Sequence, residues 1–235
     1  MSQAHSLPGM TGQKAATTVP VPVLIFIFTI CFFIFVVFPS FLSQQFSPYP
    51  LMKVEDVFAL LSPLVLIPLY WIFLSKVSVD PVKPSVAILF LVLGVLWVDG
   101  HGIHLAANSI SHLLEELQDS QAWELTYFYD EVLGHYLRDF AVMGFSVLVV
   151  AREWQRPPSA RFSPWVPVIA GILHGLTYFL IVIEGQTTLL GIPFAALFFL
   201  SGLFLGKNRI RQQPALAFFL IAYLVASLLF AGWWI

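Results

Sequence analysis

The chain has 235 residues, of which 59% are hydrophobic and only 10% are charged. Soluble domains carry about 25% charged residues, so this composition cannot cover a water-facing surface and predicts an integral membrane protein. The formal net charge of −2 argues against a nucleic acid as partner. The single cysteine, Cys31, excludes an intrachain disulfide and a multi-cysteine metal site.

Seven segments of the chain are long and apolar enough, or nearly so, to cross a bilayer, which takes about 20 apolar residues in a helix. Residues 1–20 precede them and are polar and small, which is typical of a disordered tail. The sequence therefore predicts an all-α integral membrane protein whose residues 21–235 form one domain of seven transmembrane helices. The predicted spans are about 21–42, 56–75, 84–106, 126–151, 164–185, 187–206 and 214–235.

The distribution of Lys and Arg predicts the orientation of these spans, because cytoplasmic loops carry an excess of both residues. With seven spans, the tail shares a side with the loops after the second, fourth and sixth spans. That side carries Lys14, Lys76, Lys83, Arg152, Arg156, Arg161, Lys207, Arg209 and Arg211, whereas the opposite side carries only Lys53. We expect a cytoplasmic N-terminus, an outer C-terminus and a location in the plasma (inner) membrane.

Ionisable side chains cluster in the third and fourth predicted spans. Successive residues of an α-helix are 100° apart, so His101 and His104 share one face of the third span, and Glu131 and His135 share one face of the fourth. With a rise of 1.5 Å per residue, all four lie roughly 23–32 Å above the cytoplasmic ends of their helices. Gly134 lies on the same side and permits a close approach between helices. Ionisable residues within a membrane are costly and mark functional sites.

Three histidines with a carboxylate form a ligand set suited to zinc or non-haem iron. The sequence predicts a divalent metal ion bound by His101, His104, His135 and Glu131, with Glu131 and Asp130 as catalytic residues. The predicted supporting residues are Asn108, Asp99, His174 and Glu184. The first hypothesis is a metal-dependent membrane enzyme, hydrolase-like, that acts on a lipid or lipid-soluble substrate near the outer membrane surface.

Two neighbouring residues have less direct interpretations. On a regular helix Asp99 points away from the histidines, but Gly100 and Gly102 could loosen the helix and let it turn inward. Arg138, paired with Asp139 or Asp99, is typical of a structural ion pair.

Two alternatives use the same residues. A proton-coupled transporter could relay protons from Asp139 and His174 to Glu184, although the inner half of the bundle offers few polar side chains. A haem or quinone protein could use His101 and His135 as a matched axial pair. No family is assigned, since the alkaline-ceramidase and adiponectin-receptor pattern has serine where Asn108 stands and a histidine motif in the last span.

Overall fold

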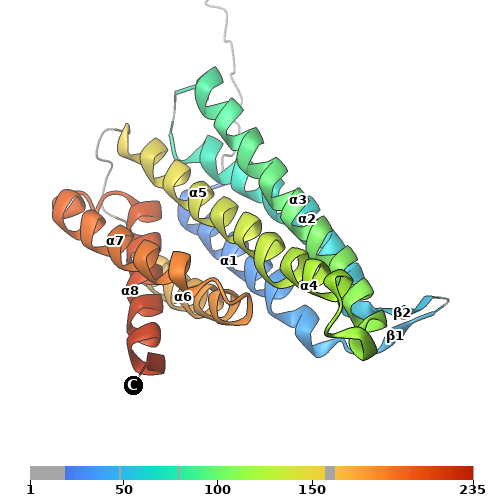
Figure 1. The fold of residues 1–235 in the computed structure, drawn as a ribbon. Coiled ribbons are helices and arrows are strands. Elements are labelled where there is room, and N and C mark those ends of the chain that lie inside the picture. Colours follow the sequence, from blue (N-terminus) through green and yellow to red (C-terminus); the bar gives the residue numbers. More distant parts are fainter. Residues whose placement is uncertain (1–18, 48, 79, 157–161, 235) are drawn as a thin grey trace, which may run out of the picture.

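The computed structural model describes residues 19–47, 49–78, 80–156 and 162–234, and these are almost entirely helical (Figure 1). The α-helices are α1 Val21–Val36, α2 Val54–Lys76, α3 Pro84–Leu113, α4 Gln121–Tyr127, α5 His135–Trp154, α6 Trp165–Glu184, α7 Thr188–Gly206 and α8 Pro214–Trp234. Short helical segments are the 3₁₀ turns η1 Phe38–Phe41 and η2 Glu115–Leu117 and the π-helix η3 Phe128–Gly134. An antiparallel hairpin pairs β1 Gln45–Phe46 with β2 Tyr49–Lys53.

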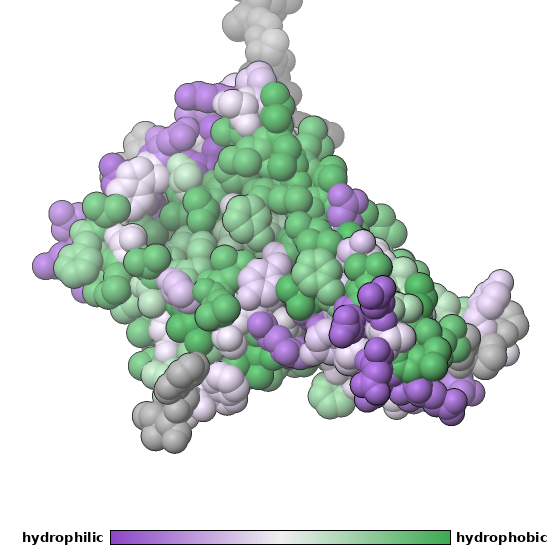
Figure 2. All heavy atoms as spheres, viewed as in Figure 1, coloured by the Kyte–Doolittle hydropathy of each residue, from purple (hydrophilic) through white to green (hydrophobic). Residues whose placement is uncertain are grey.

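The described helices form a multi-pass membrane architecture. By length and composition, six can cross a membrane: α2, α3, the continuous segment from α4 to α5, α6, α7 and α8. Their apolar side chains give the molecule a hydrophobic surface between two hydrophilic ends (Figure 2). The predicted all-α membrane bundle is confirmed at this level. The predicted tail over residues 1–20 lies almost wholly outside the described residues.

The first predicted span is shorter than expected. We predicted a helix over 21–42, but α1 has 16 residues and ends at Val36, below the length that crosses a bilayer. Pro39 follows within the 3₁₀ turn, where its missing N–H and fixed φ stop the α-helix from continuing. Of the seven predicted spans, the structure therefore supports six by length, together with one shorter apolar helix.

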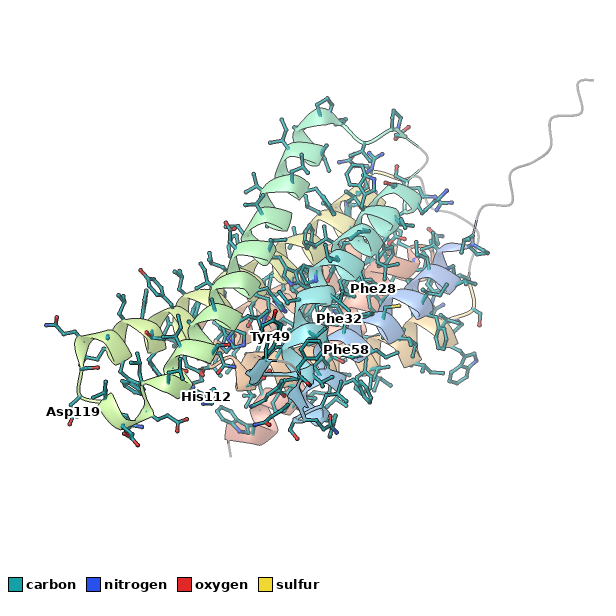
Figure 3. The ribbon with its side chains drawn as sticks, turned by 90° about the vertical axis from the view of Figure 1, so that its right-hand side faces the viewer. Phe28, Phe32, Tyr49, Phe58, His112 and Asp119 are labelled. Atoms are coloured by element: carbon teal, nitrogen blue, oxygen red, sulfur yellow. The ribbon has the colours of Figure 1, made fainter. Side chains whose placement is uncertain are left out.

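Two elements were not expected. The predicted loop after the third span is largely helical, because α3 continues to Leu113 and α4 starts at Gln121, after the Ser120 hydroxyl accepts a hydrogen bond from the Trp123 N–H at 3.2 Å. The hairpin pairs strands of two and five residues, which are too short to give a clear alternation in sequence. Figure 3 places Tyr49 on this hairpin, and His112 and Asp119 at and beyond the end of α3.

Aromatic packing fills the centre of the bundle. Tyr70 of α2 stacks on Phe145 of α5 at 4.8 Å between ring centroids, and Trp97 of α3 lies 6.1 Å from Tyr70. All three side chains are buried. This layer lies between a polar cavity near the hairpin and the end of the bundle where Lys and Arg gather.

Hydrogen bonds tie together the loops at that second end. Arg152 donates to the Asp80 carbonyl, Arg209 donates to the Trp154 carbonyl at 2.6 Å, and Gln213 donates to the Glu153 carbonyl at 3.1 Å. The loops after α2, α5 and α7 therefore meet at one end, as the predicted orientation requires. Which side of the membrane this end faces stays a prediction.

Candidate functional site

A polar cavity of about 260 Å³ lies between α1, α2, α3, α5 and α6 at the hairpin end of the bundle. Its polar lining consists of His101, His104, Asn108, Glu131, His135, Arg138, Glu184, Glu55 and Asp56. Its apolar walls include Phe32, Phe35 and Trp97. Six of the residues predicted from the sequence thus face one space: three histidines, Asn108 and two glutamates.

Two glycines allow α3 to approach the η3–α5 segment closely enough to form this cavity. A Cβ atom on Gly100 would lie 2.7 Å from the Gly134 carbonyl oxygen and 2.8 Å from the Arg138 nitrogen. A Cβ atom on Gly134 would lie 2.9 Å from the Gly100 carbonyl oxygen and 2.9 Å from His104 Cβ. The two backbones are therefore in contact at the level of the histidines, which is the close approach that Gly134 predicted.

The carboxylates beside the histidines belong to a π-helix. In η3, Phe128–Gly134, each N–H bonds to the carbonyl five residues back, which widens the turn. Such segments are frequently found at functional sites. Both Asp130 and Glu131 lie within it, and His135 begins the regular helix that follows. The widened turn lets two adjacent carboxylates both approach histidines of the site.

Asp130 holds His104. The Nδ1 atom of His104 lies 2.7 Å from Asp130 Oδ1, and Ser111 donates a hydrogen bond to the other carboxylate oxygen at 3.5 Å. Asp130 itself is only 3% exposed. The two atoms are within ion-pair distance, but their geometry does not make a hydrogen bond in the described residues, so Asp130 positions the His104 ring by charge and proximity. Asp130 therefore acts through His104 and does not line the cavity.

All three histidines of the cavity have unused nitrogens. The rings of His104 and His135 lie 4.4 Å apart between centroids. Within the described part of the chain, His101 Nδ1, His104 Nδ1 and both ring nitrogens of His135 are buried without a hydrogen-bond partner. Glu131 Oε2 lies 4.0 Å from His135 Nδ1, too far for a hydrogen bond. Buried polar atoms are nearly always satisfied, so these nitrogens are available to water or a ligand in the cavity.

The turn between α6 and α7 follows Glu184, which lines the cavity. The predicted tight turn over residues 185–188 is present, since α6 ends at Glu184 and α7 begins at Thr188. Gln186 has a positive φ of 52°, the only such non-glycine residue in the described chain. Its amide donates to Glu131 Oε2 at 3.3 Å. The unusual backbone at Gln186 thus carries a side chain that orients Glu131.

Arg138 lines the cavity, although the sequence predicts for it only a structural ion pair. Its Nε donates to Asp139 Oδ1 at 2.8 Å, which confirms the predicted ion pair, and Thr187 donates to Asp139 Oδ2 at 2.5 Å. The guanidinium nevertheless lines the cavity. The sequence contains the spacing that places it there, because Arg138 follows His135 by three residues and so shares its helical face.

Glu55 and Asp56 were also missed. Asp56 Oδ2 accepts from the Lys53 N–H at 2.7 Å at the start of α2, and Glu55 pairs with the Lys53 ammonium at 3.0 Å. In sequence both acids resemble ordinary residues of a helical first turn. Only the fold of the hairpin and α1 brings them to the cavity.

Two predicted supporting residues lie outside the cavity. Asp99 is exposed, because α3 continues as a regular helix through Gly100 and Gly102 and does not loosen there. His174 is fully buried among aromatic rings, with ring centroids 4.6 Å from Phe32 and 5.2 Å from Phe218. Neither side chain joins the other ionisable groups of the site.

No three His, Cys, Asp or Glu side chains are positioned to hold one metal ion together in residues 19–47, 49–78, 80–156 and 162–234. The predicted ligation by His101, His104, His135 and Glu131 therefore stays a prediction. The donor set fits an ion in its chemistry, since it offers unpartnered imidazole nitrogens and one histidine already oriented by a carboxylate.

Comparison with protein-family models, with curated proteins and with solved structures finds no match for this chain. What the cavity can do chemically is therefore inferred from its own residues.

Proposed function

We propose that the cavity binds one divalent metal ion, zinc or iron, through His101, His104 and His135, and that the protein is a metal-dependent membrane hydrolase. The observation that carries this proposal is the convergence of three imidazoles and Glu131 on one cavity of about 260 Å³. Three imidazole ligands would leave the fourth position of a tetrahedral ion for water, as catalytic sites require, with Glu131 beside it.

The charge of the cavity supports a cation as its ligand. Asp56, Glu131 and Glu184 face it, together with Glu55, which is paired with Lys53 at 3.0 Å, against the single guanidinium of Arg138. That guanidinium is itself paired with Asp139 at 2.8 Å. An excess of carboxylates in a site partly shielded from water attracts cations and disfavours anionic ligands.

In this proposal the metal ion supplies Lewis acidity and activates water. Glu131 accepts the proton of that water as general base, with Gln186 holding its carboxylate at 3.3 Å. Asp130 keeps the His104 ring in position through the 2.7 Å contact. Arg138 is held by Asp139 and donates from Nη2 to the Ile181 carbonyl at 3.4 Å, and it directs its remaining N–H groups to a polarised substrate oxygen.

The walls and size of the cavity support a lipid or another lipid-soluble substrate. Phe32, Phe35 and Trp97 provide an apolar wall beside the histidines. At about 260 Å³ the cavity lies just below the size range of sites that enclose a whole small molecule. It accommodates the reacting group of an amphiphile, while the apolar chain lies against the membrane-facing surface.

The transporter alternative needs a polar route through the bundle, and the packing below the cavity disfavours one. Tyr70, Trp97 and Phe145 are buried there and in ring contact. His174, the lower member of the predicted relay, is enclosed by phenylalanines. A site accessible from one side suits an enzyme better than a carrier.

The test is elemental analysis of the full chain purified in detergent, with its visible spectrum. We expect about one zinc or iron per chain, and loss of that metal in the His101→Ala and His135→Ala variants. His112→Ala is the matched control, because His112 is an exposed histidine that pairs with Glu115 outside the cavity.

A wild-type protein that binds neither zinc nor iron when supplied with each would contradict the proposal. So would a His135→Ala variant that keeps its metal. A Soret band in the visible spectrum would instead favour the haem alternative. If metal is present, release of product from neutral ester and amide amphiphiles, abolished by Glu131→Gln without loss of metal, tests the hydrolytic step.

A further inference from the structure

A second cavity, of about 550 Å³, lies at the opposite end of the bundle, where α1 and α8 begin and α2 and α5 end. Two cationic side chains, Lys76 and Arg156, line it. Two hydroxyl groups, from Ser75 and Ser78, line it as well. This combination of ammonium, guanidinium and hydroxyl donors is suited to phosphate oxygens.

The two cations lie beyond ion-pair distance of any described carboxylate, although Glu153 interacts electrostatically with Arg156. All 13 Asp and Glu residues lie in the described part of the chain, and only Asp80 and Glu153 are at this end. The Glu153 carboxylate accepts hydrogen bonds from the first N–H groups of α8, at 3.1 and 2.8 Å. Within the described residues no ion pair involves Lys76 or Arg156. The cavity is therefore electropositive.

An apolar groove of about 490 Å³ continues from this cavity. Phe162 lines both spaces, and Pro214 in the first lies one turn from Ala217 in the second on α8. Val168 of α6 and Ile221 of α8 form the sides of the groove. A basic pocket that adjoins an apolar groove at the end of the transmembrane helices matches the two parts of a lipid, a charged head group and a hydrocarbon chain.

We infer that this site binds an anionic phospholipid, with the phosphate held by Lys76 and Arg156 and one acyl chain in the groove between α6 and α8. The charge of the surroundings favours this occupant. Four further cations that are at least partly exposed, Lys83, Lys207, Arg209 and Arg211, lie at the same end. Basic residues at a membrane surface each strengthen binding to anionic lipid. The inference is independent of the proposed metal site.

The test measures the melting temperature of the full chain in detergent, by tryptophan fluorescence, while lipid is titrated. Dioctanoyl phosphatidylglycerol should raise it saturably, and dioctanoyl phosphatidylcholine and inorganic phosphate should not. In the Lys76→Gln/Arg156→Gln variant the apparent Kd for phosphatidylglycerol should rise about 25-fold, because each cation removed weakens binding by a factor of about five.

The Lys83→Gln/Lys207→Gln variant is the matched control, since it removes the same charge from the same end, at exposed residues outside both spaces. It should bind phosphatidylglycerol as the wild type does. Equal weakening in both double variants would show a diffuse surface charge and overturn the site. An equal response to inorganic phosphate would overturn the lipid as occupant, and a wild type without saturable response would overturn both.

Discussion

The contact between Gly100 and Gly134 gives the sharpest test of the site geometry. In a Gly100→Ala variant the new Cβ would lie 2.7 Å from the Gly134 carbonyl oxygen and 2.8 Å from the Arg138 nitrogen. Both are backbone atoms, so neither can rotate away. The contact has to lengthen by about 0.7 Å to reach an ordinary distance, which moves α3 away from the η3–α5 segment.

The expected magnitude follows from two opposing terms. Overpacking at a rigid contact costs about 1–3 kcal/mol. Replacement of a helical glycine by alanine stabilises by up to about 1 kcal/mol. Gly102→Ala isolates the second term, because an added Cβ there has no neighbour within 4 Å. We expect Gly100→Ala to be less stable than Gly102→Ala by about 1–3 kcal/mol, since the helical term is common to both.

The assay is equilibrium unfolding of both variants in the same detergent, followed by tryptophan fluorescence. Metal content provides a second measurement. Separation of α3 from η3 draws His104 away from Asp130, so Gly100→Ala should bind metal more weakly, and Gly102→Ala should bind it as the wild type does. If the two alanine variants are equally stable and bind metal equally, the close approach at Gly100 does not hold the site together.

Two further predictions concern individual residues. Asp130→Asn removes the charge that holds His104, so metal affinity should fall about 10–100-fold in a competition titration with a chelator, while the melting temperature changes little; unchanged affinity would contradict the role of Asp130. His174→Phe removes ring nitrogens that have no hydrogen-bond partner within the described residues, so unfolding should show equal or greater stability, by up to about 3 kcal/mol, with metal content unchanged. A loss of metal in His174→Phe would show instead that His174 contributes to metal binding.

Much of the site could be predicted from the sequence because helical periodicity and rise are fixed numbers. His101 and His104 share a face whatever the rest of the fold does, and so do Glu131 and His135. Matching their depths required only the approximate ends of two helices. Gly134 has no side chain, so it allows those two helices to approach closely. These local rules placed all four side chains against one cavity, as the structure has them.

Other parts were beyond such rules. The π-helix changes the direction of the Asp130 side chain relative to a regular α-helix, and no local sequence pattern predicts a π-helix there. Glu55 and Asp56 reach the cavity only because the hairpin and η1 fold the start of α2 over it, and strands of two and five residues leave almost no trace in sequence. Asp99 was assigned a supporting role on the expectation that two glycines loosen α3, but the helix stays regular.

His174 shows why burial of an ionisable group is a weaker indicator of function than a shared cavity. It is 0% exposed, more deeply buried than His135 at 3%. Both have ring nitrogens without a hydrogen-bond partner in the described chain. Yet His174 is surrounded by phenylalanine rings and faces no carboxylate, whereas His135 faces a cavity with two other histidines and several acids. A neutral imidazole in an aromatic environment packs much like a small aromatic ring. Ionisable groups that converge on one cavity can share a ligand or water, whereas an isolated imidazole among aromatic rings cannot, so a shared cavity is the stronger indicator of a site.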